Sequence, residues 1–386
     1  MRTFVIAAIL AALAAARGAA EPQPPSSRPQ PIQPSCLERS YWIHASLAWN
    51  PRRGYWGADL PGSTPPGEQE VRRAAGLLAG HYAANRLYLV YHKEIPLPEA
   101  REVFRWWRRH TPPGVAIVPA LVLRTYDKAS VEVFTGDEVR PLCDFFRAEI
   151  NPHQLAVFDV YPNRDQGAAL AVLAAAFPSG LIRLGLQPGE KLAPPFAAAV
   201  EDTWSAICHG RSHDDWFDAG FGAETLRRWV AERNAGPAPV AWNLIAVAWD
   251  YRHTHRGEHP GYDAPARNMP LPAGRNLLAL REILRHARPE VLAGFSSDLT
   301  ILQANSAHPT HDARPRCLHD SLKKGEAYAG YYAEPLEEIA AIYRALRDDR
   351  LPAPWTTRGG AGRSPGPAEA ADPLAPRMPD CRQRPP

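Results

Sequence analysis

The sequence predicts an α/β protein and, within that class, a single (β/α)8 barrel with insertions in the loops that follow the strands. Eight short apolar segments alternate with eight helix-like segments between residues 41 and 347. This alternation is typical of parallel strands joined by crossover helices. The stretch is about 300 residues long, somewhat above the ~250 usual for such a barrel. The alternative is an open doubly wound sheet, but no glycine-rich phosphate loop follows any of the strands.

The segment 155–167 shows the repeating unit most clearly. Residues 155–158 form a short apolar run, which predicts a buried strand. Asp159 and Tyr161 follow at once, then a polar turn, and then an alanine-rich helix. A strand that ends in an acid and leads into a helix is typical of α/β enzymes, whose sites lie at the carboxyl ends of the strands.

The first half of the domain follows the same alternation. Its helices carry apolar residues at helical spacing, such as Val71, Leu78 and Tyr82, and one has proline in its first turn. The expected order is strand 41–49, helix 68–85, strand 87–92, helix 98–110, strand 115–123, helix 137–149 and strand 155–159.

The second half continues the pattern to the last amphipathic helix, on which Leu336, Ile339 and Tyr343 share one face. The expected order is helix 168–177, strand 181–186, helix 195–200, strand 203–208, helix 215–234, strand 240–249, helix 274–288, strand 291–296 and helix 335–347.

The two ends of the chain differ in composition from this domain. Residues 1–20 have the form of a secretory signal, with Arg2, an apolar run and a small-residue cleavage site. Residues 21–36 are a proline-rich linker, and residues 352–386 are a tail rich in proline, glycine and arginine. We expect both to be disordered, the domain to span 37–351, and the protein to be secreted or periplasmic. No other segment is long and apolar enough to predict a membrane span.

Charge and cysteine content limit the partners. Loss of Arg2 and Arg17 with the signal lowers the formal charge from +3 to +1, so nothing favours nucleic-acid binding. The five cysteines are Cys36, Cys143, Cys208, Cys317 and Cys381. An exported chain can form disulfides. Cys208 with Cys317 is the expected pair, although unpaired cysteines remain an equal alternative, and the sequence indicates no oligomeric state.

Polar and aromatic side chains gather at the predicted carboxyl ends of the strands. The candidates are His44, Trp49, His92, Glu94, Arg124, Asp159, Tyr161, Asp202, Trp204, Trp249, Asp250 and Asp298. Alternation along the strands places Asp250 on one face with Ala246 and Ala248, and Asp298 on one face with Gly294 and Ser296. Small residues on the inner face would direct both acids into the barrel mouth.

Two carboxylates facing each other across a cleft suit glycosidic bond cleavage, in which one protonates the leaving oxygen and the other attacks the sugar or activates water. The domain as a whole resembles the (β/α)8 glycoside hydrolases, in which the acid usually follows strand four and the nucleophile strand seven. The resemblance implies Asp159 as proton donor, Asp250 as nucleophile or base, the other candidates as contacts to a polysaccharide or glycoconjugate, and no cofactor. The Asn-Glu pair that many such enzymes carry at strand four is absent.

Other interpretations of the same residues stay open. Acids at strand ends often cap a helix or pair with an arginine such as Arg124. His253, His255 and His259 lie close together in one polar loop and could hold a zinc ion in a metal-dependent hydrolase, or simply be solvated. A barrel that binds glycans without cleaving them fits the same aromatic and polar rim.

Overall fold

A computed structural model of the chain provides the structure. It describes residues 33–47, 66–91, 96–122, 124–126, 131–133, 135–150, 155–158, 167–176, 182–186, 200–203, 219–236, 239–249, 268–271, 273–300, 302 and 318–350. The predicted signal, most of the linker and the tail from residue 351 onward lie outside these ranges. Within them, no helix combines the length and the apolar character needed to cross a bilayer.

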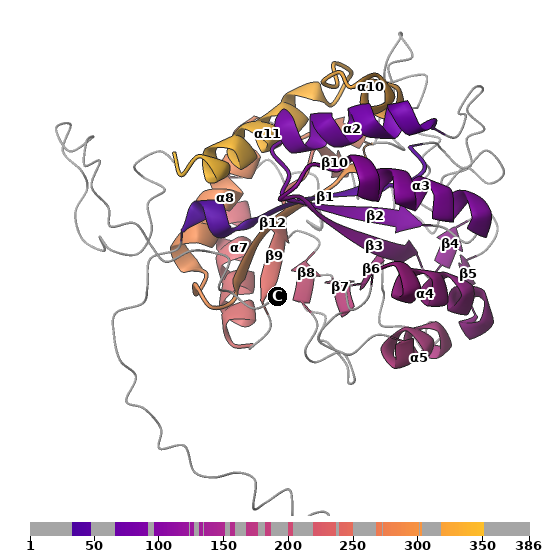
Figure 1. Ribbon diagram of the computed structural model, residues 1–386. Coiled ribbons are helices and arrows are strands. Elements are labelled where there is room, and N and C mark those ends of the chain that lie inside the picture. Colours follow the sequence, from indigo (N-terminus) through magenta and orange to yellow (C-terminus); the bar gives the residue numbers. More distant parts are fainter. Residues whose placement is uncertain are drawn as a thin grey trace, which may run out of the picture. The chain divides into compact units, whose positions relative to one another are not determined.

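The core is a parallel sheet with helices on its outside (Figure 1), which confirms the predicted α/β class. Each strand pairs in parallel with two neighbours, in the order β1-β12-β9-β8-β7-β6-β3-β2, and β2 pairs with β1. The strands are β1 (Glu38–His44), β2 (Arg86–Tyr91), β3 (Ala116–Val122), β6 (Leu155–Phe158), β7 (Ile182–Leu186), β8 (Val200–Thr203), β9 (Val240–Asn243) and β12 (Leu292–Asp298).

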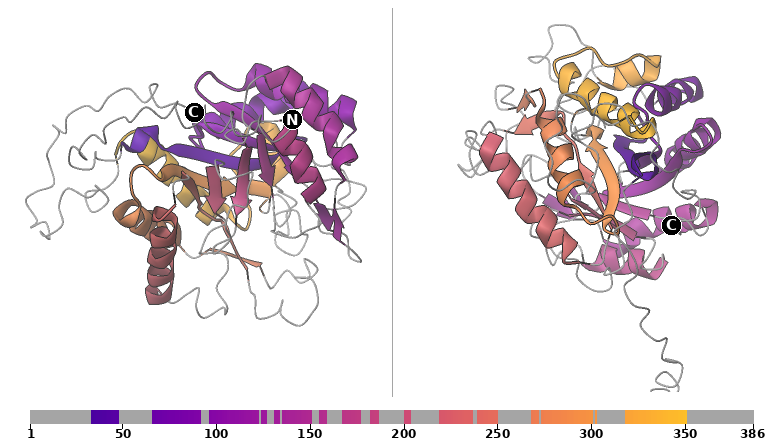
Figure 2. Two further views of the ribbon diagram at one scale, coloured as in Figure 1. Left: turned by 90° about the horizontal axis from the view of Figure 1, so that it is seen from below. Right: turned by 90° about the vertical axis from the view of Figure 1, so that its left-hand side faces the viewer.

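The helices alternate with these strands along the chain, as two further views show (Figure 2). They are η1 (Pro34–Cys36), α2 (Glu68–Gly80), α3 (Leu97–His110), α4 (Gly136–Ile150), α5 (Gly167–Ala176), α7 (Ala219–Asn234), α8 (Arg275–His286), α10 (Leu318–Lys324) and α11 (Ala333–Arg347). Between β7 and β8 the described residues contain no helix. Two antiparallel hairpins complete the set, β4 (Arg124–Tyr126) with β5 (Val131–Val133) and β10 (Val247–Trp249) with β11 (Asn268–Pro270).

Three predicted strands differ from the structure by three residues or more at an end. The predicted strand 240–249 is wrong: β9 ends at Asn243, and the next three residues lead into the hairpin strand β10. The predicted strand 203–208 is displaced, because β8 ends at Thr203. The first strand begins at Glu38 rather than residue 41, since its polar first residues have buried partners of their own.

The strand register separates an inner from an outer face. Residues that pair in register on parallel strands lie on the same face of the sheet. Trp42 pairs with Tyr88 and with Asp298. The rings of Trp42 and Tyr88 stack at 4.3 Å, and Trp42 Nε1 donates to Ser296 Oγ at 2.9 Å. These side chains therefore fill the inner face, and position 298 belongs to it.

The outer face packs against the helices. Tyr41 lies against Tyr82 and against Tyr343 of α11. On β2, Tyr91 contacts Phe104 of α3 and Phe146 of α4. Alternate residues of the same strands thus serve the two faces, as the twofold repeat of a strand requires.

The amino end of the inner face holds an ion pair between the buried Glu38 and the partly exposed Arg86. Glu38 accepts from Tyr88 OH at 2.9 Å and lies 3.1 Å from Arg86 Nη1. Gly294 of β12 pairs with Glu38 and has φ +149°, where a Cβ would come within 2.3 Å of the Glu38 backbone. Only glycine permits this approach of β12 to β1.

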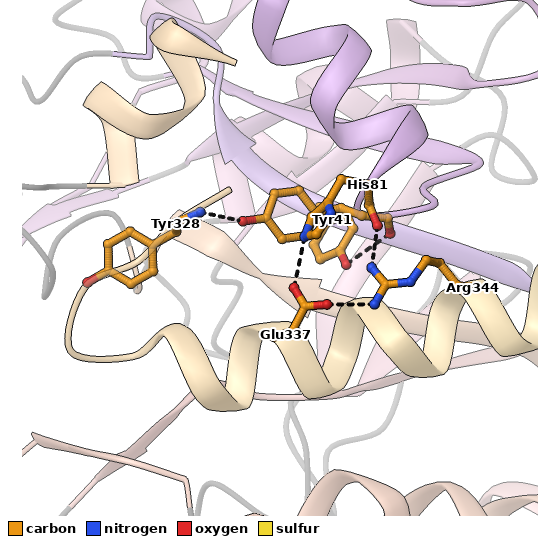
Figure 3. A network of polar contacts seen from close by, with 6 residues as sticks. Tyr41, His81, Tyr328, Glu337 and Arg344 are labelled. Carbon is orange, nitrogen blue, oxygen red and sulfur yellow. Dashed lines mark hydrogen bonds and ion pairs between the residues drawn. The ribbon is translucent and has the colours of Figure 1, made fainter. Parts of the chain in front are cut away.

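A polar network joins the residues after α2 to α11 and to β1 (Figure 3), where Tyr41 OH donates to the Tyr82 carbonyl. Arg344 donates to the carbonyl of His81 at 2.7 Å and to Glu337 at 2.6 Å, and His81 lies 2.8 Å from the same carboxylate. Partial burial acts to raise the pKa of Glu337, but the hydrogen bonds of Arg344 and His81 hold this pKa below its usual value. Residues separated by more than 250 positions therefore close the domain together.

The segment before β1 is ordered. Ser35 N donates to Asp349 Oδ1 at 2.8 Å, and the Arg39 guanidinium donates to the carbonyls of Ser35, Leu37 and Ala83. Burial lowers the pKa of Arg39. Residues 33–36, the last part of the predicted linker, are therefore held against the domain.

Two of the five cysteines lie in described segments. Cys36 is disulfide-bonded, and Cys143 is free and buried, with its thiol pKa raised to about 12 by that burial. The partner of Cys36 is therefore Cys208, Cys317 or Cys381, all outside the described residues. The predicted Cys208–Cys317 pair is possible only if Cys381 is the partner of Cys36.

A matched pair of tyrosine variants tests the outer face. Tyr91 is buried, its hydroxyl has no hydrogen-bond partner among the described residues, and burial raises its pKa well above the usual value. Tyr41 is equally buried, but its hydroxyl donates to the Tyr82 carbonyl at 3.2 Å. We expect Tyr91→Phe to leave the free energy of unfolding unchanged or raise it by up to about 1 kcal/mol, and Tyr41→Phe to lower it by about 1 kcal/mol. Urea denaturation measures both, and equal losses would contradict the assignment.

Candidate functional site

The carboxyl ends of the parallel strands meet at one end of the sheet, where α/β barrels bind their ligands. Three described strands end there in polar residues that are at least nine-tenths buried. They are His44 on β1, Asn243 on β9 and Asp298 on β12. The register places all three on the inner face with Trp42. His44 lies two residues after Trp42 on the same strand, Asp298 pairs with Trp42, and Asn243 pairs with Ser296, two residues before Asp298.

Asp298 is held in a fixed orientation. Its Oδ1 accepts from the backbone nitrogen of Thr300 at 2.8 Å and from the Thr300 hydroxyl at 2.5 Å. Both donors come from the turn that immediately follows β12, so the sequence Asp298-Leu299-Thr300 orients the carboxylate locally. The prediction that Asp298 shares a face with Gly294 and Ser296 is confirmed by the register of β12 against β1.

His44 lies beside a second histidine that the sequence analysis did not select. The ring centroids of His44 and of His319, on α10, are 6.2 Å apart. Burial first, and then the charge of Lys323, lower the pKa of His319 to about 3. His319 is therefore a neutral imidazole in the physiological range, with one nitrogen that donates and one that accepts a hydrogen bond.

Asn243 ends β9 and is fixed by its chain neighbours. Leu244 N donates to the Ser296 carbonyl at 2.7 Å. Asn276 of α8 then binds both polar groups of the Ile245 backbone, accepting from its nitrogen at 3.0 Å and donating to its oxygen at 2.9 Å. A fully buried side chain thus replaces the strand partner that β9 would need to continue, and it ends the strand at Asn243.

The predicted site residues fall into three groups. The side chains of His44 and Asp298 are described, and both lie at the expected end of the sheet. The backbones of Arg124, Asp202 and Trp249 are described, but Arg124 and Trp249 belong to the hairpin strands β4 and β10 rather than to strands of the parallel sheet. The remaining candidates lie outside the described residues; they are Trp49, His92, Glu94, Asp159, Tyr161, Trp204, Asp250, His253, His255 and His259.

The end of β9 changes the basis for Asp250. The alternation that placed Asp250 with Ala246 and Ala248 assumed one strand to residue 249, and this strand ends at Asn243. Asp250 follows β10, which pairs antiparallel with β11. Only the position of Asp250 in the chain, after β9 and the hairpin strand β10, now supports its predicted role as nucleophile or base.

Two site residues escaped the sequence analysis. Asn243 stands between apolar residues in V-A-W-N-L-I. A single polar residue inside such a run can indicate the end of a strand, and this signal could have identified Asn243. His319 follows a long loop after the last strand, and no local pattern separates it from the other histidines.

The fold and the site define an α/β protein in which buried polar side chains converge at the carboxyl end of a parallel sheet. No protein-family model matches this chain. A comparison with curated proteins also gives no match. Among the described residues, no group of three or more histidine, cysteine, aspartate or glutamate side chains is arranged to hold a metal ion.

Proposed function

We propose that the chain is a secreted, glycoside-hydrolase-like enzyme built on a complete (β/α)8 barrel. The closed order of parallel strand pairing supports the barrel, and the segment between β7 and β8 would supply the remaining helix. The observation that carries the functional proposal is the set of buried polar groups at the carboxyl end, namely His44, Asn243 and Asp298. Among them, Asn243 Oδ1 has no hydrogen-bond partner in the described part of the chain, and a substrate rich in hydroxyls would supply one, because a buried polar group needs hydrogen-bond partners.

The proposed chemistry uses two carboxylates. Asp159 comes directly after Phe158, the last residue of β6, and would protonate the leaving oxygen. Asp250 would act as the nucleophile or as the base that activates water. Asp298 is a third carboxylate, at the end of the last strand. The polysaccharide or glycoconjugate would contact the remaining candidates, and none of these roles requires a cofactor.

The test measures hydrolysis of a broad panel of oligosaccharides by the wild type and by Asp159→Asn and Asp250→Asn. Each change removes a charge with almost no change in volume, so we expect turnover to fall by about 10²- to 10⁴-fold while the protein stays folded. Asp137→Asn is the control, because Asp137 is exposed on α4. Full activity of both variants would reject the pair and direct the test to Asp298.

Two further outcomes separate the other interpretations. Loss of activity with a chelator, restored by zinc, would favour the metal-dependent hydrolase with His253, His255 and His259. Binding without cleavage across the panel would favour a non-catalytic glycan-binding barrel. Neither binding nor cleavage would reject the carbohydrate proposal altogether.

A further inference from the structure

Asn243 carries an unsatisfied hydrogen-bond acceptor inside the barrel mouth. The residue is only 4% exposed, and its Oδ1 has no hydrogen-bond partner among the residues that the structure describes. A buried acceptor without a partner costs about 1–3 kcal/mol. Folded proteins keep few such groups, and each one calls for an explanation.

The neighbours of Asn243 have hydrogen-bond and ring contacts of their own. Ser296, the residue in register with Asn243, accepts from Trp42 Nε1, and Trp42 is stacked on Tyr88. The backbone after Asn243 is anchored twice, at Leu244 to Ser296 and at Ile245 to Asn276. The backbone that carries Asn243 is therefore anchored, and its Oδ1 meets no donor among the described residues.

Position distinguishes Asn243 from other buried groups of this kind. Tyr91 and Ser297 also have side-chain oxygens without a partner in the described part of the chain. Tyr91 packs against helices α3 and α4, and Ser297 is in register with Tyr41, which also faces the helices. Asn243 instead lies on the inner face at the carboxyl end of its strand, where barrels bind ligands.

We infer that Asn243 Oδ1 is the acceptor for a hydroxyl group of the bound glycan, an inference that rests on the proposed function. A hydroxyl donates the hydrogen bond that the amide oxygen lacks. Asp298 belongs to the same face of the adjacent strand, two residues beyond Ser296, and is oriented by Thr300. Asn243 therefore offers one acceptor to a ring hydroxyl, on the strand next to that of Asp298, so the substrate class is one with free hydroxyls on a ring.

The experiment compares the wild type with Asn243→Leu in the full chain. Leucine has the same number and branching of side-chain heavy atoms as asparagine, without the polar atoms. We expect the affinity for the bound oligosaccharide to fall at least about tenfold. Without the ligand, the melting temperature should stay the same or rise, because an unsatisfied acceptor has been removed. The probes are hexasaccharides of cellulose, xylan, mannan and chitin, measured by calorimetry.

Two variants complete the design. Asn243→Asp keeps an acceptor oxygen at the same position and should bind the oligosaccharide more tightly than Asn243→Leu does. Ser297→Ala removes a buried hydroxyl that faces the helices and should bind as the wild type does. Unchanged affinity in Asn243→Leu would overturn the inference, and so would a melting temperature lowered by several degrees, which would show a structural role. If the wild type binds none of the four probes, the proposed function fails, and the inference fails with it.

Discussion

Gly294→Ala is expected to lower the free energy of unfolding by about 3 kcal/mol or more. The new methyl group would stand 2.3 Å from the backbone nitrogen and oxygen of Glu38, and backbone atoms cannot rotate away. The φ of +149° adds strain for any residue with a Cβ. The only relief is to separate β12 from β1, which breaks the parallel pairing at that point. Urea denaturation followed by circular dichroism measures the loss.

Gly76→Ala is the matched control for this change. Gly76 lies inside helix α2, and a Cβ there meets no atom within 4 Å. Alanine favours the helix over glycine by up to about 1 kcal/mol, so this variant should be more stable than the wild type. If Gly294→Ala and Gly76→Ala had the same stability, the close approach of β12 to β1 would be wrong.

Asn276→Leu is expected to cost about 2–5 kcal/mol, because it leaves two buried backbone groups of Ile245 without partners. The residue is fully buried, so water cannot take the place of the amide. The segment after Asn243 would lose its anchor, and we expect weaker glycan binding in addition to lower stability. Thermal unfolding and the calorimetric titration measure the two effects separately.

Asn234→Leu provides the control for Asn276. Asn234 also binds two backbone groups, donating to the His286 carbonyl at 2.7 Å and accepting from Arg288 N at 2.8 Å. These groups are partly exposed at the end of α8, so water replaces the lost bonds and the cost should be about 1 kcal/mol or less. A cost equal to that of Asn276→Leu would show that burial does not determine the effect.

The alternation of strands and helices could be predicted because it follows from the local spacing of apolar residues. Val71, Ala74 and Leu78 bury one face of α2, as their spacing indicates. Strand ends set by distant residues could not be predicted in this way. Asn243 is the one local signal in the apolar run from Val240, and it is Asn276, 31 residues beyond Ile245, that binds the backbone after β9. Likewise, Glu38 joins β1 because Arg86 and Tyr88 satisfy its charge inside the sheet.

The candidate site was predictable to a similar extent. Asp298 could be placed because the twofold repeat of its strand held as far as the last residue. His319 could not, since nothing in its short helix indicates that it meets His44 from the first strand. Asn243 was not predicted at a strand end, because its strand was expected to continue to residue 249. That longer strand made Asp250 the candidate instead.

The pairing of β1 with β12 has a consequence for biosynthesis. About 250 residues separate the two strands, so at ~5–20 residues per second a ribosome needs on the order of 10–50 s to complete the second one. During that time one edge of β1 has no partner and is open to other chains. Contacts of such long sequence separation also slow folding itself. We therefore expect a slow final folding step, dependent on α11 and the last strand, and a requirement for chaperones while the chain is incomplete.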